Sequence, residues 1–234
     1  MNSSHLSKRL AEVANHVEVG SRLADIGSDH AYLPIYLAKN RIISYGIASE
    51  VAKGPMSNAV TEIRKENLLG ILHPRLADGL AAIQGPDEIN VITICGMGGS
   101  LISKILEEGK RKLSGKEKLV LQPNVGEHLV RNWLMLNSYQ IMAEQILEED
   151  GHIYEIITAK KSSQPVNYSN KQLQFGPFLM KEKSAVFIRK WQEELQSKKR
   201  VFNQISRSNR DESTKLNKIA EEIKMIEEVL KGEG

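Results

Sequence analysis

The stretch RLADIGSDHAYLP, residues 22–34, decides the fold because it joins an apolar strand pattern to a helical pattern across a single glycine. Gly27 has no side chain and lets the chain turn sharply between the two elements. In an open parallel sheet, ligands bind outside the carboxyl ends of the strands, and the polar residues around Gly27 occupy such an end. We therefore expect Asp25, Ser28 and Asp29 to border a ligand site.

Strand and helix patterns alternate along the first two thirds of the chain. The strand patterns cover residues 22–27, 44–49, 71–78, 89–96 and 118–123. The helical patterns cover residues 4–17, 31–40, 52–67, 98–109 and 126–137. This alternation predicts an α/β fold, a Rossmann-like parallel sheet with helices on both faces. Two further strand patterns, 139–150 and 152–160, have no helix between them and predict an antiparallel hairpin at the sheet edge.

The character of the sequence changes after the polar segment 160–170, which contains Pro165. Two amphipathic helical patterns follow, separated by the polar break SNRDEST, and they predict an antiparallel helical coiled-coil hairpin. Trp191 and Phe202 are expected in the core of this hairpin. We expect two domains, residues 1–164 and 165–234.

Composition excludes several classes of protein. The chain has 234 residues and one cysteine, Cys95, so an intrachain disulfide and a cysteine-based zinc site are both excluded. We expect no metal. No apolar run reaches the length of a membrane span and the start does not resemble a signal peptide, so a cytoplasmic protein without a membrane partner is expected.

Positive charge is concentrated in the C-terminal part. Residues 1–164 hold 18 Lys/Arg and 19 Asp/Glu, whereas residues 165–234 hold 14 and 10. Within residues 181–210 there are nine basic and three acidic residues. Such a stripe suits a polyanion, and nucleic acid is the commonest one. A solvated helix face is the alternative explanation.

Two more acidic residues stand at the ends of the next strands. Glu50 follows Gly27 by 23 residues, close to the spacing of a ribose-binding acid. Asp78 could accept a hydrogen bond from an adenine amino group. Each acid also has a purely structural explanation: Asp29 and Glu50 could cap helices, and Asp78 could close an Asp–Gly turn.

The acidic first turn separates two nucleotide cofactors. A dinucleotide site would have G-x-G-x-x-G here to admit a pyrophosphate, but this turn has one glycine followed by a carboxylate, which repels phosphate. S-adenosylmethionine has no phosphate and carries a sulfonium and an ammonium group, which carboxylates attract. The sequence therefore favours methyl transfer over hydride transfer.

The fourth and fifth strands end in CGMGGS, residues 95–100, and in QPN, residues 122–124. The glycines could let the backbone approach a cofactor or a flat base, or they could serve packing alone. The amide groups of QPN could hold a substrate edge or close a turn. His30 and His152 could be acid or base groups, although an isolated histidine is more often a hydrogen-bonded scaffold residue.

Seven stretches carry a family resemblance. They are LSKRLAEVA (6–14), DIGSDHAYLP (25–34), SEV (49–51), RLADGL (75–80), ICGMGG (94–99), LQPN (121–124) and EEDGHIYEI (148–156). Together they closely resemble the bacterial tRNA adenine-N-1 methyltransferases of the TrmK type, which methylate adenine 22 of tRNA. The resemblance implies a class I methyltransferase domain followed by a helical coiled-coil domain.

The resemblance also implies roles for individual residues. It assigns the amino-acid end of S-adenosylmethionine to Asp25, Gly27, Ser28 and Asp29, the ribose to Glu50, the adenine to Asp78 and Gly79, and the loop between cofactor and base to Gly96, Met97 and Gly98. The N-P-P-Y signature of amino-directed adenine methyltransferases is absent. This absence fits a ring-nitrogen target.

Chemistry explains the lack of an obvious base. N-1 of neutral adenine has an in-plane lone pair and needs no deprotonation, so positioning can carry most of the catalysis. We expect Asp29, His30 and Asn124 as catalytic candidates, with Asp29 offsetting the positive charge of the product. Tyr32 and Met97 are further candidates around the base, which must leave its stack or pair to react.

The basic stripe provides candidates for tRNA binding. On the helices they are Lys190, Lys198, Lys199, Arg200, Arg207 and Arg210, and near the mouth of the site Lys8 and Arg9. Two alternatives to a tRNA methyltransferase remain at this point: an NAD-dependent oxidoreductase, and an RNA-binding or interaction module on a degenerate methyltransferase fold. Because the two terminal helices can satisfy each other within one chain, a monomer is expected.

Overall fold

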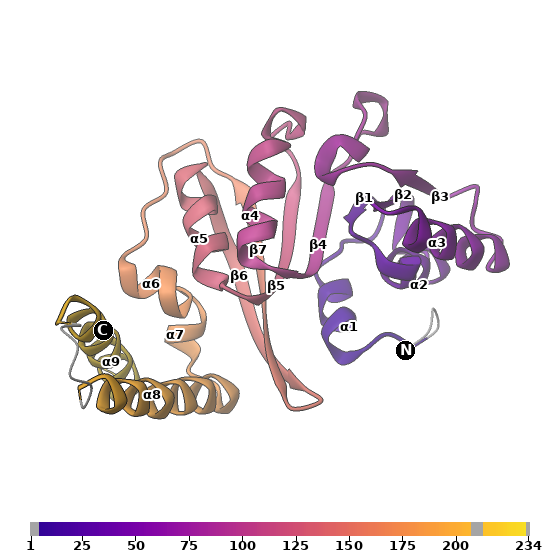
Figure 1. The fold of residues 1–234 in the computed structure, drawn as a ribbon. Helices are drawn as coiled ribbons and strands as arrows, with labels where there is room; N and C mark the ends of the chain where they lie inside the picture. Colours follow the sequence, from indigo (N-terminus) through magenta and orange to yellow (C-terminus); the bar gives the residue numbers. More distant parts are fainter. Residues whose placement is uncertain (1–4, 207–212, 233–234) are drawn as a thin grey trace.

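A computed structural model describes residues 5–206 and 213–232. Its centre is a seven-stranded sheet with the order β3-β2-β1-β4-β5-β7-β6 (Figure 1). The strands are β1 (Ser21–Ile26), β2 (Ile43–Glu50), β3 (Leu72–Leu76), β4 (Val91–Gly98), β5 (Lys118–Val125), β6 (Tyr139–Glu149) and β7 (His152–Lys161). The first five are parallel, and β7 pairs antiparallel with both β5 and β6. The predicted sheet and its edge hairpin are confirmed.

Helices cover both faces of the sheet, also as predicted. One buried cluster joins the sheet to α4 (Gly99–Glu108) and α5 (Glu127–Leu136), through side chains such as Ile102 and Leu134. The cluster on the other face contains residues of α1 (Lys8–Asn15), α2 (Tyr32–Lys39) and α3 (Lys53–Lys65). Four short 3-10 helices lie in the connections of the described chain, η1 (Asp29–Ala31), η2 (Gly79–Ala82), η3 (Gly85–Asp87) and η4 (Lys110–Lys112).

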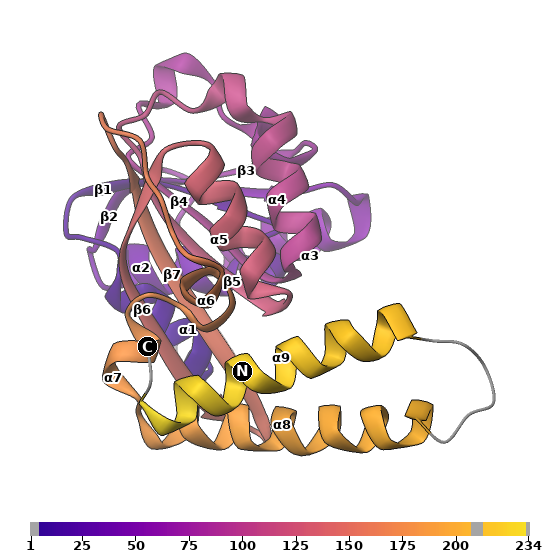
Figure 2. The ribbon, with the colours of Figure 1, turned by 90° about the vertical axis from the view of Figure 1, so that its left-hand side faces the viewer.

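The C-terminal part is helical and ends in the expected antiparallel pair. After α6 (Asn170–Phe175) and α7 (Leu179–Glu182), the long helices α8 (Ala185–Ser206) and α9 (Ser213–Lys231) run side by side (Figure 2). Trp191 lies in a buried cluster with Phe175, Phe187 and Ile226, as expected. Phe202 is only half-buried and does not belong to that cluster, because it lies farther along α8, beyond the part that packs on the sheet domain.

A buried charge network ties the helical part to the sheet. The Arg131 guanidinium on α5 is fully buried, donates to Glu144 of β6 at 2.6 Å and forms a second ion pair with Glu155 of β7. Glu155 in turn accepts a hydrogen bond from Lys190 of α8 at 2.7 Å. Arg131 also donates to the carbonyl oxygen of Leu173 in α6 at 3.2 Å. The segment after the expected boundary at residue 164 is therefore anchored by ionic contacts as well as apolar ones.

None of the described helices combines the length and the apolar character needed to cross a membrane.

Candidate functional site

A pocket of about 430 Å³ opens at the carboxyl ends of the parallel strands. Its lining includes nine of the residues predicted from the sequence: Arg9, Asp25, Gly27, Ser28, Asp29, Glu50, Gly96, Met97 and Asn124. The other lining residues are Leu10, Leu33, Pro55, Cys95 and Tyr154. The topology explains the convergence, because β1, β2, β4 and β5 are neighbours in the parallel part of the sheet and end on the same side.

Asp25 is the most buried acid of this site, with 4% of its surface exposed. Its carboxylate accepts hydrogen bonds from the hydroxyls of Ser28 and Thr93, both at 2.6 Å. Burial nevertheless raises the pKa of Asp25 from 3.8 to about 6, because the two hydroxyl donors compensate only part of the lost hydration. The charge of Glu50 adds to this rise in pKa. A cation entering the pocket would relieve both effects.

The turn after β1 has an unusual backbone. Gly27 has a φ of 70°, and the three residues Asp29, His30 and Ala31 also have positive φ values of 31°, 56° and 56°. The N-cap of α2 is Ala31, and no side chain caps that helix. The proposal that Asp29 caps a helix is therefore wrong. Its side chain is 78% exposed at the mouth of the pocket.

Glu50 connects the ends of the first two strands. Its Oε1 accepts a hydrogen bond from the backbone N–H of Asp29 at 2.6 Å, and only 8% of the residue is exposed. The N-cap of α3 is Ala52, which forms no side-chain cap bond. The helix-cap explanation of Glu50 is also wrong, since this carboxylate holds the turn after β1 instead.

Side chains from α1 and β5 hold the loop at the end of β4. The Oε1 of Gln122 accepts hydrogen bonds from the backbone N–H of Gly96, at 2.9 Å, and from the Arg9 guanidinium. The amide of Asn124 donates to the carbonyl oxygen of Gly96 at 2.8 Å. Arg9 also lies over the ring of Tyr154, 5.2 Å from its centroid. Sequence reasoning placed Arg9 and Asn124 near the site and offered the Gln122 amide for a substrate edge or a turn, but it did not predict that Gln122 holds the Gly96 loop.

Two glycines allow close packing at the site, one against a side chain and one against backbone. A Cβ on Gly27 would stand 2.0 Å from Cε of Met97, whose side chain covers this turn. A Cβ on Gly99, at the start of α4, would stand 2.1 Å from the carbonyl oxygen of Gly126. The GMGG stretch thus serves close packing as well as the pocket. Beside it, burial raises the pKa of the Cys95 thiol far above its ordinary value, so this thiol stays protonated.

Six of the residues predicted at the cofactor, at the base or near the mouth of the site do not line the pocket. They are Lys8, His30, Tyr32, Asp78, Gly79 and Gly98. The rings of His30 and Tyr32 stack on each other with centroids 5.3 Å apart. Asp78 is exposed at the N-cap of η2 and makes no side-chain cap bond there. The Lys8 ammonium donates to the carbonyl oxygen of Glu148 at 3.2 Å, near the end of β6.

The basic candidates on α8 differ from one another. Lys190 is paired with Glu127 at 2.5 Å and Glu155 at 2.7 Å, so it is not a free cation for phosphate. Lys198 bridges to Glu222 of α9 at 2.7 Å. Lys199 pairs with Glu227 at 2.5 Å but keeps 50% of its side chain exposed, and the exposed Arg200 has no ion pair with the described residues. Arg207 and Arg210 lie outside the described residues.

The donor set of the pocket fits a cationic cofactor. The three carboxylates of Asp25, Asp29 and Glu50 line one cavity with a single guanidinium, that of Arg9. This balance favours a sulfonium and an ammonium group over a pyrophosphate. The protein groups therefore agree with S-adenosylmethionine and disagree with a dinucleotide. No cluster of three or more metal-ligating side chains occurs in the part of the chain that the structure describes.

Comparison with known proteins identifies the same class. The family model described as tRNA (adenine(22)-N(1))-methyltransferase matches residues 23–228. The protein of that name from Bacillus subtilis is 43% identical over 98% of this chain and 99% of its own length. A Streptococcus pneumoniae structure, described as a putative tRNA (m1A22) methyltransferase in complex with S-adenosyl-L-methionine, has a TM-score of 0.88 with 43% identity, covering 97% and 100% of the chains. A Mycoplasma capricolum structure with S-adenosyl-homocysteine has a TM-score of 0.86 with 28% identity, covering 97% and 98%.

Proposed function

The chain belongs to the tRNA (adenine(22)-N(1))-methyltransferase family, and on this basis we propose how its residues transfer a methyl group from S-adenosylmethionine to N-1 of adenine 22 in tRNA. The observation that carries the proposal is the set of three carboxylates, Asp25, Asp29 and Glu50, around one pocket at the strand ends. The NAD-dependent alternative is rejected, because these carboxylates repel a pyrophosphate. The degenerate-fold alternative is disfavoured by the 43% identity, over 98% of this chain, to the Bacillus subtilis methyltransferase.

The residues around the first turn hold the cofactor. When bound, S-adenosylmethionine supplies an activated methyl group on a sulfonium. Asp25 and Asp29 attract its positive charges, and Ser28 orients Asp25 through their 2.6 Å hydrogen bond. Glu50, fixed by the N–H of Asp29, is placed to accept hydrogen bonds from ribose hydroxyls. Asp78 and Gly79, which do not line the pocket, stay candidates for contacts to the adenine of the cofactor.

The chain positions the target base and does not need to deprotonate it. Adenine N-1 is nucleophilic as the neutral base, so the rate gain comes from holding it in line with the methyl group. The Gly96 loop forms the surface against which the base is positioned. Gln122 accepts a hydrogen bond from the N–H of Gly96 and Asn124 donates one to its carbonyl oxygen, so the loop is held in place. The exposed Asp29 carboxylate offsets the positive charge that the base acquires. In this proposal His30 lies beside the target adenine, and its ring is held in place by stacking on the ring of Tyr32.

The helical pair is the tRNA-binding part in this proposal, with residues 1–164 as the catalytic domain and 165–234 as the helical domain. Lys199 and Arg200 are the phosphate contacts on α8, supported by their exposure and by the incomplete neutralisation of this helix face. Arg9, which lines the pocket, and Lys8, its neighbour in α1, are further phosphate candidates in this proposal. A monomer is proposed, because α8 and α9 pack on each other, and a cytoplasmic location is proposed from the tRNA substrate.

Two measurements test the function. Calorimetric titration of the full chain should show binding of S-adenosylmethionine and none of NAD, because the pocket rejects a pyrophosphate. Incubation with unmodified tRNA and methyl-labelled cofactor should then label the RNA. Asp29→Ala should remove this labelling while leaving the thermal unfolding midpoint unchanged, since the side chain is exposed. A fully active Asp29→Ala enzyme, or binding of NAD in place of S-adenosylmethionine, would overturn the proposal.

A further inference from the structure

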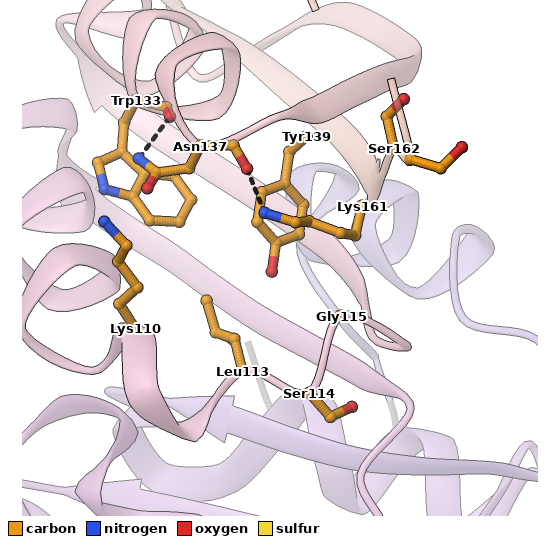
Figure 3. A pocket seen from close by; sticks show the side chains of 10 residues that line it. Lys110, Leu113, Ser114, Gly115, Trp133, Asn137, Tyr139, Lys161 and Ser162 are labelled. Atoms are coloured by element: carbon orange, nitrogen blue, oxygen red, sulfur yellow. Dashed lines mark hydrogen bonds between the residues drawn. The ribbon is translucent and has the colours of Figure 1, made fainter. Parts of the chain in front are cut away.

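A second pocket, of about 410 Å³, lies at the end of the sheet opposite the cofactor site, near the start of β5. It is lined by Lys110, Leu113, Ser114, Gly115, Trp133, Asn137, Tyr139, Lys161, Ser162 and Ser163 (Figure 3). The rim residues Ser114 and Gly115 precede Lys118, the first residue of β5. Asn124, near the end of the same strand, lines the first pocket. At about 3.3 Å per residue, the two pockets are roughly 20 Å apart along this strand. Neither the proposed reaction nor the cofactor uses the second pocket.

Tyr139 gives this pocket a hydrogen-bond donor with no protein partner. The residue is only 2% exposed, and among the described residues its hydroxyl has no hydrogen-bond partner. Figure 3 shows this hydroxyl pointing into the cavity, toward Leu113 and the loop at Gly115. Burial, with a smaller contribution from the charge of Glu117, raises the pKa of Tyr139 to about 12, so the phenol keeps its proton and can donate it. The hydroxyl faces the open pocket, where it can donate a hydrogen bond to a ligand.

The charges around the cavity select an anion. Two ammonium groups line it, those of Lys110 and Lys161, and in the described part of the chain its lining includes no carboxylate. The Lys161 ammonium lies 5.1 Å from the centroid of the Tyr139 ring and donates to the carbonyl oxygen of Asn137 at 2.6 Å, leaving two of its protons for other acceptors.

The nearest carboxylates are already occupied. Glu117 accepts hydrogen bonds from the backbone N–H groups of Ser114, at 2.6 Å, and Gly115, at 2.8 Å. Glu107 accepts one from Trp133 at 2.9 Å and pairs with Lys110 at 3.3 Å. The segment KRKLSGKEK, residues 110–118, which carries the rim, has five basic residues and one acidic residue. The rim therefore carries an excess of positive charge, and the exposed Lys110 ammonium shares its charge with Glu107.

The apolar part of the wall suits a planar group. Trp133 and Tyr139 stand with ring centroids 5.6 Å apart, and Leu113 packs against the same cluster from across the cavity. Hydroxyl groups of Ser114, Ser162 and Ser163 complete the lining. A cavity of this size, half apolar in its walls and with a few convergent donors, has the features of a small-molecule site.

We propose that this second pocket binds one nucleotide, with its phosphate between Lys110 and Lys161, its base against Leu113 and Trp133, and a hydrogen bond from the Tyr139 hydroxyl. The nucleotide is either a free ribonucleotide or one unit of an RNA chain, because both present the same phosphate and base. A phosphate contact roughly 20 Å from the reacting base would hold an RNA in register without reading its sequence.

Binding measurements on the full chain test this proposal independently of methyl transfer. The protein is first saturated with S-adenosylhomocysteine to fill the cofactor pocket, and is then titrated by calorimetry with uridine 5′-monophosphate, uridine and inorganic phosphate. A parallel titration uses unmodified tRNA. The variants are Tyr139→Phe and Lys110→Gln, and the matched controls are Tyr36→Phe and Lys104→Gln, which change the same groups on residues outside the pocket.

The proposal expects uridine 5′-monophosphate to bind more tightly than uridine or phosphate, and each pocket variant to weaken it roughly tenfold, the effect of one hydrogen bond to a charged group. The controls should bind like the wild type. If free nucleotides do not bind but both pocket variants weaken tRNA binding, the nucleotide belongs to the RNA. Unchanged tRNA affinity together with no nucleotide binding would overturn the proposal, and so would equal affinity for phosphate and nucleotide. Because Lys110 is exposed, its variant stays informative even if Tyr139→Phe alters folding.

Discussion

The backbone N–H of Asp29 donates a hydrogen bond to the carboxylate of Glu50 at 2.6 Å, which joins the turn after β1 to the end of β2. This bond holds the buried Glu50 beside the exposed Asp29, although the two residues lie 21 positions apart in the sequence. The turn itself has three successive non-glycine residues with positive φ, a conformation that costs free energy and needs such support.

Replacing Glu50 should therefore affect the cofactor more than the fold. Glu50→Gln keeps an acceptor for the Asp29 N–H but removes the charge, and we expect S-adenosylmethionine to bind roughly tenfold more weakly. Glu50→Ala should weaken it further, because the turn loses its anchor. Calorimetry measures both, with Glu62 of α3, a half-buried acid outside the pocket, changed to Gln as a control. Wild-type cofactor affinity in Glu50→Ala would rule out this role.

Asp25 makes stability depend on pH in a defined direction. Its pKa is about 6 in the folded protein and about 3.8 in the unfolded chain, so between these values only the folded protein keeps the proton. The contribution of Asp25 to the free energy of unfolding is full below pH 4 and falls as the pH rises through 6, by about 3 kcal/mol in total.

Asp25→Asn should remove this loss. The free energy of unfolding of the variant, measured relative to wild type in urea, should increase between pH 4 and pH 7, while cofactor affinity at pH 7 decreases because the charge is gone. A difference in stability that is constant across this pH range would show that Asp25 titrates normally.

The Arg131 network predicts a large effect on stability. Arg131→Met leaves Glu144 buried without its cation and deprives Glu155 of one of its two partners, so we expect a loss of about 3–5 kcal/mol in the free energy of unfolding. Lys198→Met removes partly exposed ion pairs and should cost less than about 1 kcal/mol. Urea denaturation of both variants checks the contrast, and equal losses would mean that the buried network does not anchor the helical part.

The phosphate contacts on α8 should appear in the salt dependence of tRNA binding. Changing Lys199 and Arg200 together to Ala should weaken binding and reduce the slope of log affinity against log salt by roughly one to two, one for each lost phosphate contact. The control is Lys104→Ala on α4, an exposed cation of the sheet domain. Filter binding from low to moderate salt measures the slope. An unchanged slope would assign tRNA binding to another surface.

The order of elements and much of the site could be predicted from the sequence, because both depend on local patterns. Strand ends in a parallel sheet converge, so Asp25, Asp29 and Glu50 could be brought together without coordinates. The role of Gln122 in holding the Gly96 loop could not be predicted, because its hydrogen bond with Arg9 joins residues 113 positions apart. The expectation that Lys190 is free to bind phosphate was not met for the same reason. Its charge fits the basic stripe, but Glu127 and Glu155 contact it only in the folded protein.

The second pocket lay beyond sequence reasoning as well. Its donor, Tyr139, begins β6, and its lysines belong to the 3-10 helix η4 and to the end of β7. Nothing in the pattern of any one segment marks them as neighbours. The antiparallel pairing of β6 with β7 places Tyr139 opposite Lys161, and this register creates the site.

The most direct test of the account is to locate the methyl group on the RNA. The wild-type chain is incubated with labelled S-adenosylmethionine and either an unmodified tRNA transcript with adenine 22 or the same transcript with guanine 22, and the product is digested and mapped by mass spectrometry. We predict 1-methyladenosine at position 22 of the first transcript and no methylation of the second. Methylation of both transcripts to the same extent, or of neither, would contradict the account.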